Sequence, residues 1–367
     1  MSLVVFPFKK ERIEVVARNL QIAATHDRVD EVWAVAAAED AAMAEISRVA
    51  SAVARTTGTG IDVFPQDRIG TYRSGKGDGM NTALARSAER GFDRTHFYDA
   101  DITNFEPSWI DGAEQAADRG YGVVRHRFPR AATDAMITWM VTRPGLAVRF
   151  PGTVLPRLGQ PLGGELLLTT PAVEHLAANR TVRARSDWGI DTVITHATAC
   201  LDLGLFEHNA SDGKRHALYG SLTDIREMVL ECLDAVASLR GDPPPNSQFD
   251  ADPPAPVPAD LKETVAYDVE TTRDSISEAP DASEREILIS LGIDPDSSID
   301  MDAEQWRDVL PALLREFDLG DPAWRAAAFR LWVERVIHYT LHQVPLGYDE
   351  AISYLEGTIR QFEETGT

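Results

Sequence analysis

The chain has 367 residues, 44% of them hydrophobic, which suffices for one large domain or two smaller ones with a proper core. Its formal net charge of -22 argues against a nucleic-acid binder, which would need a basic face. No apolar run reaches about 18 residues, so no membrane span is predicted. The apolar start at residues 1–8 is followed rather than preceded by basic residues, which argues against a signal peptide.

The cysteine and lysine contents are both low. Only Cys200 and Cys232 occur, which gives no disulfide framework and leads us to expect a cytoplasmic protein. Only five of the 36 basic residues are lysines. An acidic, lysine-poor surface suits high salt, whereas a GC-rich genome exchanges lysine for arginine without any role for salt. The composition leaves both explanations open.

The first third of the chain alternates predicted strands and helices. Strands are expected at residues 3–6, 32–36, 61–64 and 95–98, and helices at residues 11–24, 41–54 and 80–88. This βαβα order predicts a parallel sheet with helices on both faces. Ligands of such sheets bind beyond the carboxyl ends of the strands, and the motifs at Pro7-Phe8-Lys9, Gln66 and Asp99-Ala100-Asp101 fall there.

The remaining chain divides at a proline-rich segment. Residues 241–260 contain seven prolines, which exclude a helix or a central strand and favour a stiff, exposed linker. After it, residues 261–367 show helical spacing of apolar residues. We therefore predict an α/β domain over residues 1–240, a linker over 241–260 and a helical C-terminal region over 261–367.

The sharpest motif is His96-Phe97-Tyr98-Asp99-Ala100-Asp101-Ile102. An apolar strand runs into two aspartates separated by one small residue, so both carboxylates are able to turn toward one ligand. Hard oxygen donors suit Mg²⁺ or Mn²⁺, which also bind diphosphate oxygens. An isolated Asp-x-Asp pair is common on protein surfaces, but its place after the fourth strand of an α/β domain favours a metal site.

A second motif is Gly75-Lys76-Gly77-Asp78-Gly79-Met80-Asn81. Three glycines in five positions predict a loop whose backbone N–H groups approach phosphates. Lys76 adds a positive charge, and a helix starting near Met80 adds the positive end of its dipole. The alternative is a plain glycine turn before a helix.

These motifs belong to a set of segments in which the chain resembles the mannosylglycerate synthase family, retaining glycosyltransferases with a GT-A fold. The resemblance runs from Met1 to about Cys232, with a weaker echo at Val265–Glu270 and across the helical tail. The matching segments are Met1–Lys9, Gly75–Leu84, His96–Thr103, Thr133–Met140, Gln160–Leu167 and Arg185–Thr192.

The resemblance implies a set of site residues. Those matching donor-binding positions are Pro7, Phe8, Lys9, Gln66, Lys76, Asp99, Ala100, Asp101, Leu162, Gly163 and Asp191. Those matching acceptor-binding positions are Arg130, Asp134, Ala135, Thr138, Tyr219 and Met228. The implied ligands of a divalent metal, Mn²⁺ or Mg²⁺, are Asp99, Asp101 and His216. The implied catalytic residues are Lys76, Asp101 and Asp191.

The function expected from the resemblance is transfer of α-mannose from GDP-mannose to D-glycerate, which makes the compatible solute mannosylglycerate. A related enzyme using GDP-glucose, lactate or glycolate is the near alternative, because one pocket residue decides between such substrates. A sugar nucleotidyltransferase is a distant alternative, since Pro7-Phe8-Lys9-Lys10 is not a glycine-rich basic loop. A sugar-nucleotide sensor would be expected to lack a metal ligand. We expect a homo-oligomer without nucleic-acid or membrane partners.

Overall fold

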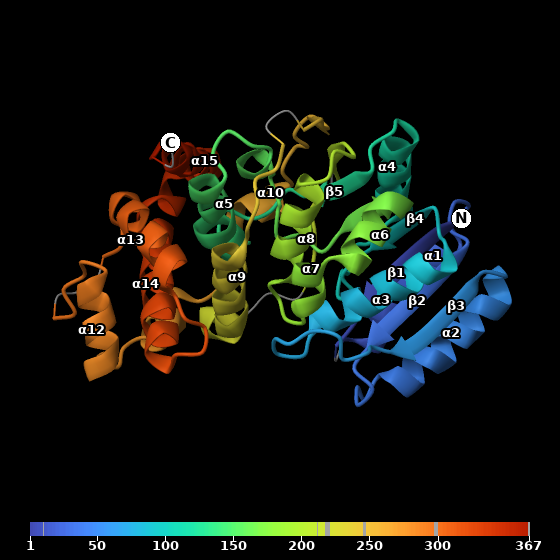
Figure 1. Cartoon of the computed structure of the whole chain (residues 1–367), viewed down its shortest axis with the longest axis horizontal. Helices are drawn as coiled ribbons and strands as arrows, with labels where there is room; N and C mark the ends of the chain where they lie inside the picture. Colours follow the sequence, from blue (N-terminus) through green and yellow to red (C-terminus); the bar gives the residue numbers. More distant parts are fainter. Residues whose placement is uncertain (10, 211, 217–220, 245–246, 297–299, 366–367) are drawn as a thin grey trace. The chain divides into compact units, whose positions relative to one another are not determined.

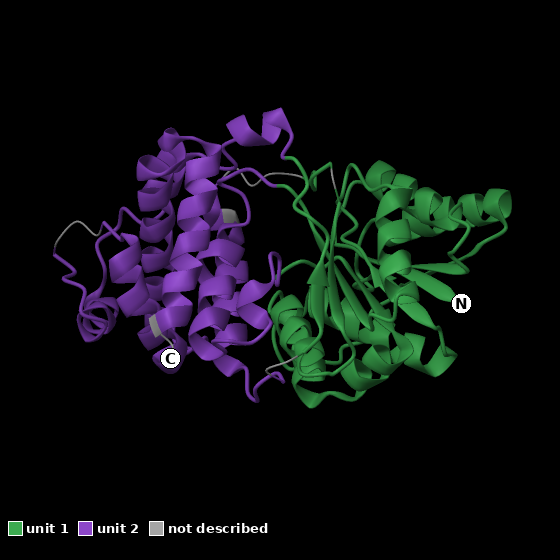
Figure 2. Ribbon diagram, turned by 90° about the horizontal axis from the view of Figure 1, so that it is seen from above, with its two compact units in different colours: residues 1–129, 162–217, 246–256 green, residues 130–161, 218–245, 257–367 purple. Residues whose placement is uncertain are grey.

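The computed structural model describes residues 1–9, 11–210, 212–216, 221–244, 247–296 and 300–365. They form two compact units, each discontinuous in sequence (Figure 2). Unit 1 comprises Met1–Pro129, Leu162–Ala217 and Asn246–Pro256. Unit 2 comprises Arg130–Pro161, Leu218–Pro245 and Val257–Thr367. None of the described helices is long and apolar enough to cross a membrane.

Unit 1 is an α/β unit with helices on both faces of one sheet (Figure 1). Its strands are β1 (Ser2–Pro7), β2 (Glu31–Ala36), β3 (Gly60–Pro65), β4 (Arg94–Phe97), β5 (Val123–Arg127), β6 (Leu166–Thr169), β7 (Leu205–Asn209) and β8 (Phe249–Ala251). Its helices are α1 (Ile13–Ala24), α2 (Met43–Thr57), α3 (Lys76–Arg90), α4 (Pro107–Asp118), α6 (Thr170–Ala178), α7 (Arg180–Ala184) and α8 (Ile190–Ala199).

The strand order is β3-β2-β1-β4-β6-β5-β7-β8. The first four strands in the sequence pair in parallel, as their alternation with helices predicts. The sheet as a whole is mixed, because β6 runs antiparallel to both β4 and β5. Within the segment expected to be a linker, β8 pairs with β7 as an edge strand, the position that a proline-rich neighbourhood tolerates.

The core of unit 1 follows from alternation along the strands. Val4 and Phe6 of β1 pack with Val16 and Leu20 of α1 on one face of the sheet. The intervening Val5 is also fully buried, because α3 covers the opposite face. Strands buried on both faces read as continuous apolar runs, which is why β1 and β2 are recognisable in the sequence.

Unit 2 is helical. Its elements are η1 (Thr138–Thr142, a π-helix), α5 (Arg143–Arg149), η2 (Leu155–Arg157), η3 (Leu222–Ile225), α9 (Arg226–Ser238), α10 (Ala259–Glu263), α11 (Val269–Asp274), α12 (Ala282–Ser290), α13 (Ala303–Glu316), α14 (Pro322–His342), η4 (Val344–Leu346) and α15 (Tyr348–Thr365). The fully buried Trp306 of α13 donates its indole N–H to the Met140 carbonyl. Arg143 makes a two-pronged ion pair with Glu356 of α15. The helices after the proline-rich segment are thereby joined to residues 138–149.

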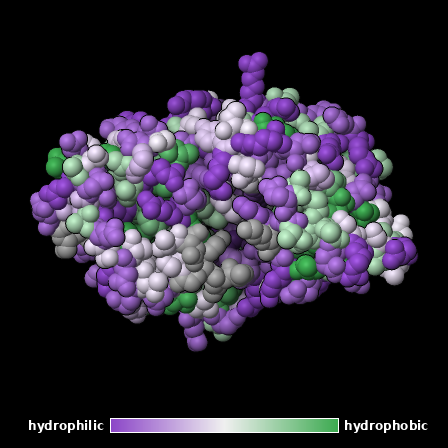
Figure 3. All heavy atoms as spheres, turned by 90° about the horizontal axis from the view of Figure 1, so that it is seen from below, coloured by the Kyte–Doolittle hydropathy of each residue, from purple (hydrophilic) through white to green (hydrophobic). Residues whose placement is uncertain are grey.

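The surface of the protein is mainly hydrophilic on the face drawn in Figure 3. Hydrophilic residues predominate there, and hydrophobic residues lie in separate groups between them.

The expected glycine-rich phosphate loop differs from the observed structure. Helix α3 begins at Lys76 rather than near Met80, so Gly77 and Gly79 lie in its first turn. A Cβ at Gly77 would lie 2.5 Å from the Arg185 carbonyl oxygen and 2.6 Å from the Ser186 carbonyl carbon. Glycine is required there because the helix packs directly against the backbone of residues 185–186, and not because a loop needs backbone freedom.

We predict that Gly77→Ala lowers the free energy of unfolding by about 1–3 kcal/mol, since the backbone at Arg185 and Ser186 has to move to admit a methyl group. Chemical denaturation followed by circular dichroism measures this change. Gly357→Ala in α15 is the matched control, because the nearest atom to its Cβ would be 3.8 Å away. Alanine should raise stability at that helical position. Equal stability of Gly77→Ala and the unsubstituted chain would contradict the packing argument.

Candidate functional site

Asp99 and Asp101 lie in the loop that follows β4, at the carboxyl edge of the parallel strands. Three hydrogen bonds hold this loop. The Tyr98 backbone N–H donates to the Val5 carbonyl, and the side-chain amide of the buried Asn19 donates to the carbonyls of Ala100 and Ile102. The Asp-x-Asp motif is therefore anchored to both β1 and α1.

Lys76 joins two of the predicted site carboxylates. Its Nζ lies 2.7 Å from Asp99 Oδ1 and 2.9 Å from Asp191 Oδ2. Lys76 is the first residue of α3, and Asp191 lies in the first turn of α8. The Lys76 ammonium also lies 5.9 Å from the centre of the Trp188 ring, within range of a cation–π interaction. Helix starts far apart in the sequence thus bring Lys76, Asp99 and Asp191 together.

A second lysine completes the cluster. Lys214 Nζ lies 2.7 Å from the other carboxylate oxygen of Asp99 and 2.6 Å from Glu165 Oε1. Sequence reasoning placed Lys214 next to His216 without giving it a role. The rarity of lysine in this chain was the signal that could have identified it, because only five lysines occur and two of them hold Asp99.

Burial and charge pull the pKa values of this cluster in opposite directions. Burial acts to raise the pKa of Asp99, but Lys214 and Lys76 outweigh it and hold that pKa well below its ordinary value. Burial acts to lower the pKa of Lys76, but Asp191 and Asp99 outweigh it and raise that pKa. For Glu165 and Asp191 burial prevails, and their pKa values are raised despite the adjacent lysines.

The segment before β6 shapes the space around Lys76. A Cβ at Gly164 would lie 2.3 Å from Lys76 Nζ and 2.7 Å from Asp99 Oδ1, so glycine is what admits the ion pair. The neighbouring Gly163 carbonyl accepts a hydrogen bond of 2.6 Å from Nη2 of the buried Arg125. Sequence reasoning selected Leu162 and Gly163, and the structure adds Gly164 and Arg125.

His216 belongs to a segment that is tied to the loop after Asp101. The Arg215 carbonyl accepts hydrogen bonds from the backbone and hydroxyl of Thr103. Asn104 contacts the same segment twice, at the Gly213 carbonyl and the Arg215 N–H. In this structure Asp99, Asp101 and His216 do not bring their ligand atoms within 4.8 Å of one another, the spacing found for a single group elsewhere among the described residues.

The surroundings of Asp101 are negatively charged. Burial, and then the charge of Asp101, raise the pKa of Glu11 to about 7. Among the described residues, no hydrogen bond or ion pair neutralises the Asp101 carboxylate. The loop carries two carboxylates, the kind of oxygen donor that suits Mn²⁺ or Mg²⁺, and both oxygens of Asp99 are engaged by Lys76 and Lys214 in this structure.

The other predicted donor residues lie at the same edge of the sheet. The Phe8 N–H donates to the Val35 carbonyl, and the Gln66 N–H donates to the Ala36 carbonyl. Pro7 and Gln66 both lie beside Gly79 of α3, at 3.6 and 3.2 Å from the position a Cβ would take. Lys9 is exposed. The ends of β1 and β3 are thus held against the start of α3.

The predicted acceptor residues belong to unit 2. Arg130 Nη1 lies 2.9 Å from Asp134 Oδ2, and both side chains are half-buried. The Tyr348 hydroxyl donates to the Arg130 carbonyl, and Asp134 Oδ1 accepts from the Ala135 N–H. Met228 lies in α9. Tyr219 lies outside the described residues.

Two backbone features mark this acceptor segment. Ala135 has a φ of 58°, the single positive φ found for a non-glycine residue in the described chain. A π-helical turn begins three residues later, at Thr138. Left-handed non-glycine residues and π-helical turns are both concentrated at functional sites, so the geometry favours a binding role for this segment. Neither feature has a sequence signature.

Comparison with known proteins gives matches over nearly the whole chain. The family model described as "Mannosylglycerate synthase, GT domain" matches residues 2–238. The model described as "Mannosylglycerate synthase C-terminal domain" matches residues 261–359. A mannosylglycerate synthase of Rhodothermus marinus is 45% identical over 97% of this chain and 92% of its own length. One of Selaginella moellendorffii is 41% identical over 98% and 89%.

Solved structures show the same fold at lower identity. Glucosyl-3-phosphoglycerate synthase from Mycobacterium tuberculosis, in complex with Mg²⁺ and uridine diphosphate, has a TM-score of 0.51 and 20% identity over 65% of this chain and 78% of its own. The same protein with Mn²⁺, uridine diphosphate and glucosyl-3-phosphoglycerate has a TM-score of 0.50 and 19% identity over 65% and 79%. These matches support the GT-A fold. The two matching family models and the relatives of 45% and 41% identity show that this chain belongs to the mannosylglycerate synthase family and is a hexosyltransferase.

Proposed function

We propose that the protein transfers α-mannose from GDP-mannose to D-glycerate with retention of configuration, aided by a divalent metal. The observation that carries this proposal is the cluster in which Lys76 contacts both the half-buried Asp99 and the buried Asp191. It combines a cation for a diphosphate, a carboxylate for a metal and a carboxylate for the sugar. The cytoplasmic location and the homo-oligomer expected from the sequence stay predictions.

The donor half of the proposal rests on local positive charge in an acidic protein. Lys76 and Lys214 place two ammonium groups beside Asp99 at the carboxyl edge of the sheet. An anionic diphosphate arriving there would share the positive charge now directed at Asp99. The Mycobacterium tuberculosis structures in complex with Mn²⁺ or Mg²⁺ and uridine diphosphate support a nucleoside diphosphate sugar as the donor class.

The metal would be held by Asp99, Asp101 and His216. After burial, the charges of Asp101, Asp99 and Asp40 all act to raise the pKa of Glu11, and this gathering of carboxylates supports a divalent cation here. Such a cation would neutralise charge on the departing diphosphate. Four hydrogen bonds between residues 103–104 and 213–215 keep His216 next to the Asp-x-Asp loop.

The acceptor half of the proposal rests on Arg130. A small carboxylate such as glycerate is best held by the planar fork of an arginine, which offers two parallel N–H groups. Asp134 lies 2.9 Å from one arm of that fork and fixes its orientation. Asp134 would also accept a hydrogen bond from a glycerate hydroxyl.

We assign the chemistry to a same-face transfer without a covalent intermediate. Asp134, Glu165 and Asp191 are the candidate nucleophiles in the matching segments, and we propose that none of them is a true nucleophile. Lys76 would stabilise the charge that develops on the leaving oxygen, which takes the proton of the attacking acceptor hydroxyl. Asp191 Oδ1 is buried without a hydrogen-bond partner among the described residues, so it would accept from a sugar hydroxyl and orient the ring.

The overall proposal is tested by incubating purified protein with GDP-mannose and D-glycerate. We expect release of GDP that requires glycerate and also requires a divalent metal, either Mn²⁺ or Mg²⁺. GDP-glucose as donor, and lactate or glycolate as acceptor, distinguish the related activities left open by the sequence. If turnover is faster with one of these substrates, that substrate takes the place of GDP-mannose or glycerate in the proposal. GDP release without any acceptor would contradict the proposal.

Asp101→Ala should lower turnover by at least about a thousandfold, or about 4 kcal/mol, because the diphosphate loses charge neutralisation as it leaves. His216→Ala should lower the rate and raise the metal concentration required for half-maximal activity. Asp27→Ala, an exposed aspartate between α1 and β2 at the opposite edge of the sheet, is the control and should retain full activity. Full activity of Asp101→Ala would remove this residue from the metal site.

Arg130→Lys keeps the positive charge but loses the planar fork. We expect the KM for the acceptor to rise about tenfold, or about 1.4 kcal/mol, as for one lost charged hydrogen bond. The KM for the donor serves as an internal control and should stay nearly constant. A rise confined to the donor KM would show that Arg130 binds the nucleotide instead.

Asp191→Ala should slow transfer about a hundredfold or more, because the sugar loses its orienting acceptor and Lys76 loses a partner. The product should keep the α configuration, which proton NMR of the anomeric signal reports. Mass spectrometry of unsubstituted enzyme quenched with donor should find no hexosyl adduct. A stable adduct on Asp191 or Glu165 would overturn the same-face mechanism in favour of a double displacement.

A further inference from the structure

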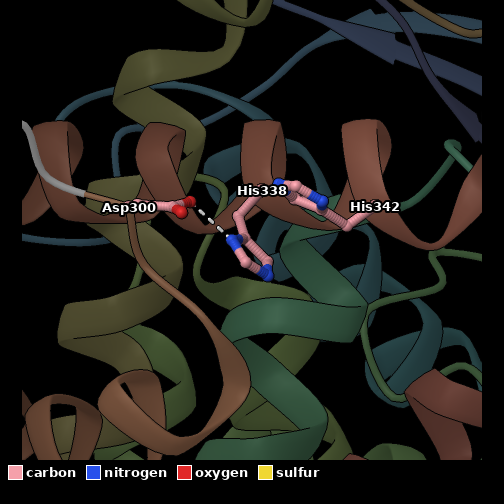
Figure 4. Close-up of side chains that lie close together, drawn as sticks. All are labelled: Asp300, His338 and His342. Carbon is pink, nitrogen blue, oxygen red and sulfur yellow. Dashed lines mark hydrogen bonds and ion pairs between the residues drawn. The ribbon is translucent and has the colours of Figure 1, made fainter.

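Unit 2 contains a cluster of metal-ligand side chains that plays no part in the proposed transfer. His338 and His342 lie on the last two turns of α14, and Asp300 lies in the loop that precedes α13 (Figure 4). The three residues bring one ligand atom each within 4.8 Å of one another. Among the described residues this is the single group of three or more such side chains with that spacing.

The positions of the two histidines follow from helix geometry. A spacing of four residues puts both rings on one face of α14, and their centres lie 4.5 Å apart with the planes tilted by 38°. His338 is half-buried, and His342 and Asp300 are exposed. The pair is thus preformed by the helix and accessible from solvent.

Asp300 completes the cluster from a different element. Its Oδ1 lies 2.5 Å from His338 Nδ1, and its side chain is 68% exposed. Asp302, two residues later, is the N-cap of α13 and forms a capping box with Gln305, which anchors the loop. Because the Asp300 side chain is exposed, it is free to rotate. It could then exchange its hydrogen bond with His338 for coordination of an ion that His338 also binds.

We infer that Asp300, His338 and His342 form a binding site for a first-row transition-metal cation such as Zn²⁺. Two imidazoles and one carboxylate match the ligand types that Zn²⁺ takes, with water free to fill a fourth position. Mg²⁺ and Ca²⁺ prefer oxygen ligands, so the cluster should discriminate against them. The ion would join the loop before α13 to the end of α14.

Helix α14 also supports the segment that carries Arg130. Tyr339, the neighbour of His338, donates its hydroxyl to the Ala132 carbonyl. An ion at the end of α14 would therefore stabilise the helix that holds the segment carrying Arg130.

The experiment is Zn²⁺ titration of the metal-stripped full-length chain by isothermal titration calorimetry. Asp101→Ala is titrated in parallel, so that binding at the proposed donor-site metal is measured separately. We expect the combined substitution His338→Ala and His342→Ala to lose one Zn²⁺ site or weaken it by about a hundredfold or more. Asp101→Ala should keep that site. Loss of the site in Asp101→Ala with retention in the double variant would place Zn²⁺ at the Asp-x-Asp motif and overturn the inference.

Two further variants keep the test decisive. His175→Ala removes an exposed helical histidine that pairs with Asn179 instead of a carboxylate, and should bind Zn²⁺ as the unsubstituted chain does. Asp300→Asn changes an exposed loop residue, so this variant should fold normally. Its affinity for Zn²⁺ should nevertheless fall by at least about tenfold. Unchanged Zn²⁺ binding in Asp300→Asn and in the double histidine variant would refute the site.

Discussion

Charge pairing inside a strongly acidic chain is the constraint on which the site depends. Glu165 and Asp191 are buried carboxylates and Asp99 is half-buried, and an unpaired carboxylate that is buried would take up a proton. Lys76 and Lys214 each bridge two of these carboxylates. The lysines hold Asp99 ionised, and they place two positive charges at this site in a protein of net charge -22.

The reversed strand β6 brings these charges together. In a wholly parallel sheet, the residues before a strand lie at the edge away from the ligand. Because β6 is antiparallel to β4, Leu166 pairs with Phe97, and the residues that precede it lie beside the Asp-x-Asp loop. Gly164 and Glu165 thereby reach Lys76 and Lys214. A single change of strand direction thus adds a fifth chain segment to the site, beside those that carry Lys76, Asp99, Asp191 and Lys214.

In the helical unit, the C-terminal helices support a segment with an unfavourable backbone conformation. Ala135 has a left-handed backbone conformation, which costs free energy for a residue with a Cβ. Hydrogen bonds from Tyr339 and Tyr348 reach the carbonyls of Ala132 and Arg130, and Thr133 bonds to the backbone of residues 264–266. This gives the C-terminal helices a definite structural role, because they fix the backbone of the segment that carries Arg130.

The sequence by itself determined that β1 to β4 run parallel and that the C-terminal region is helical. Both follow from the spacing of apolar residues within short segments of the chain. Its resemblance to a known family also pointed to Lys76, Asp99 and Asp191. Only the tertiary structure decided the direction of β6, the roles of Lys214 and Gly164, and the start of α3 at Lys76. These features depend on contacts between residues far apart in the chain, and such contacts leave no periodic signal in the sequence.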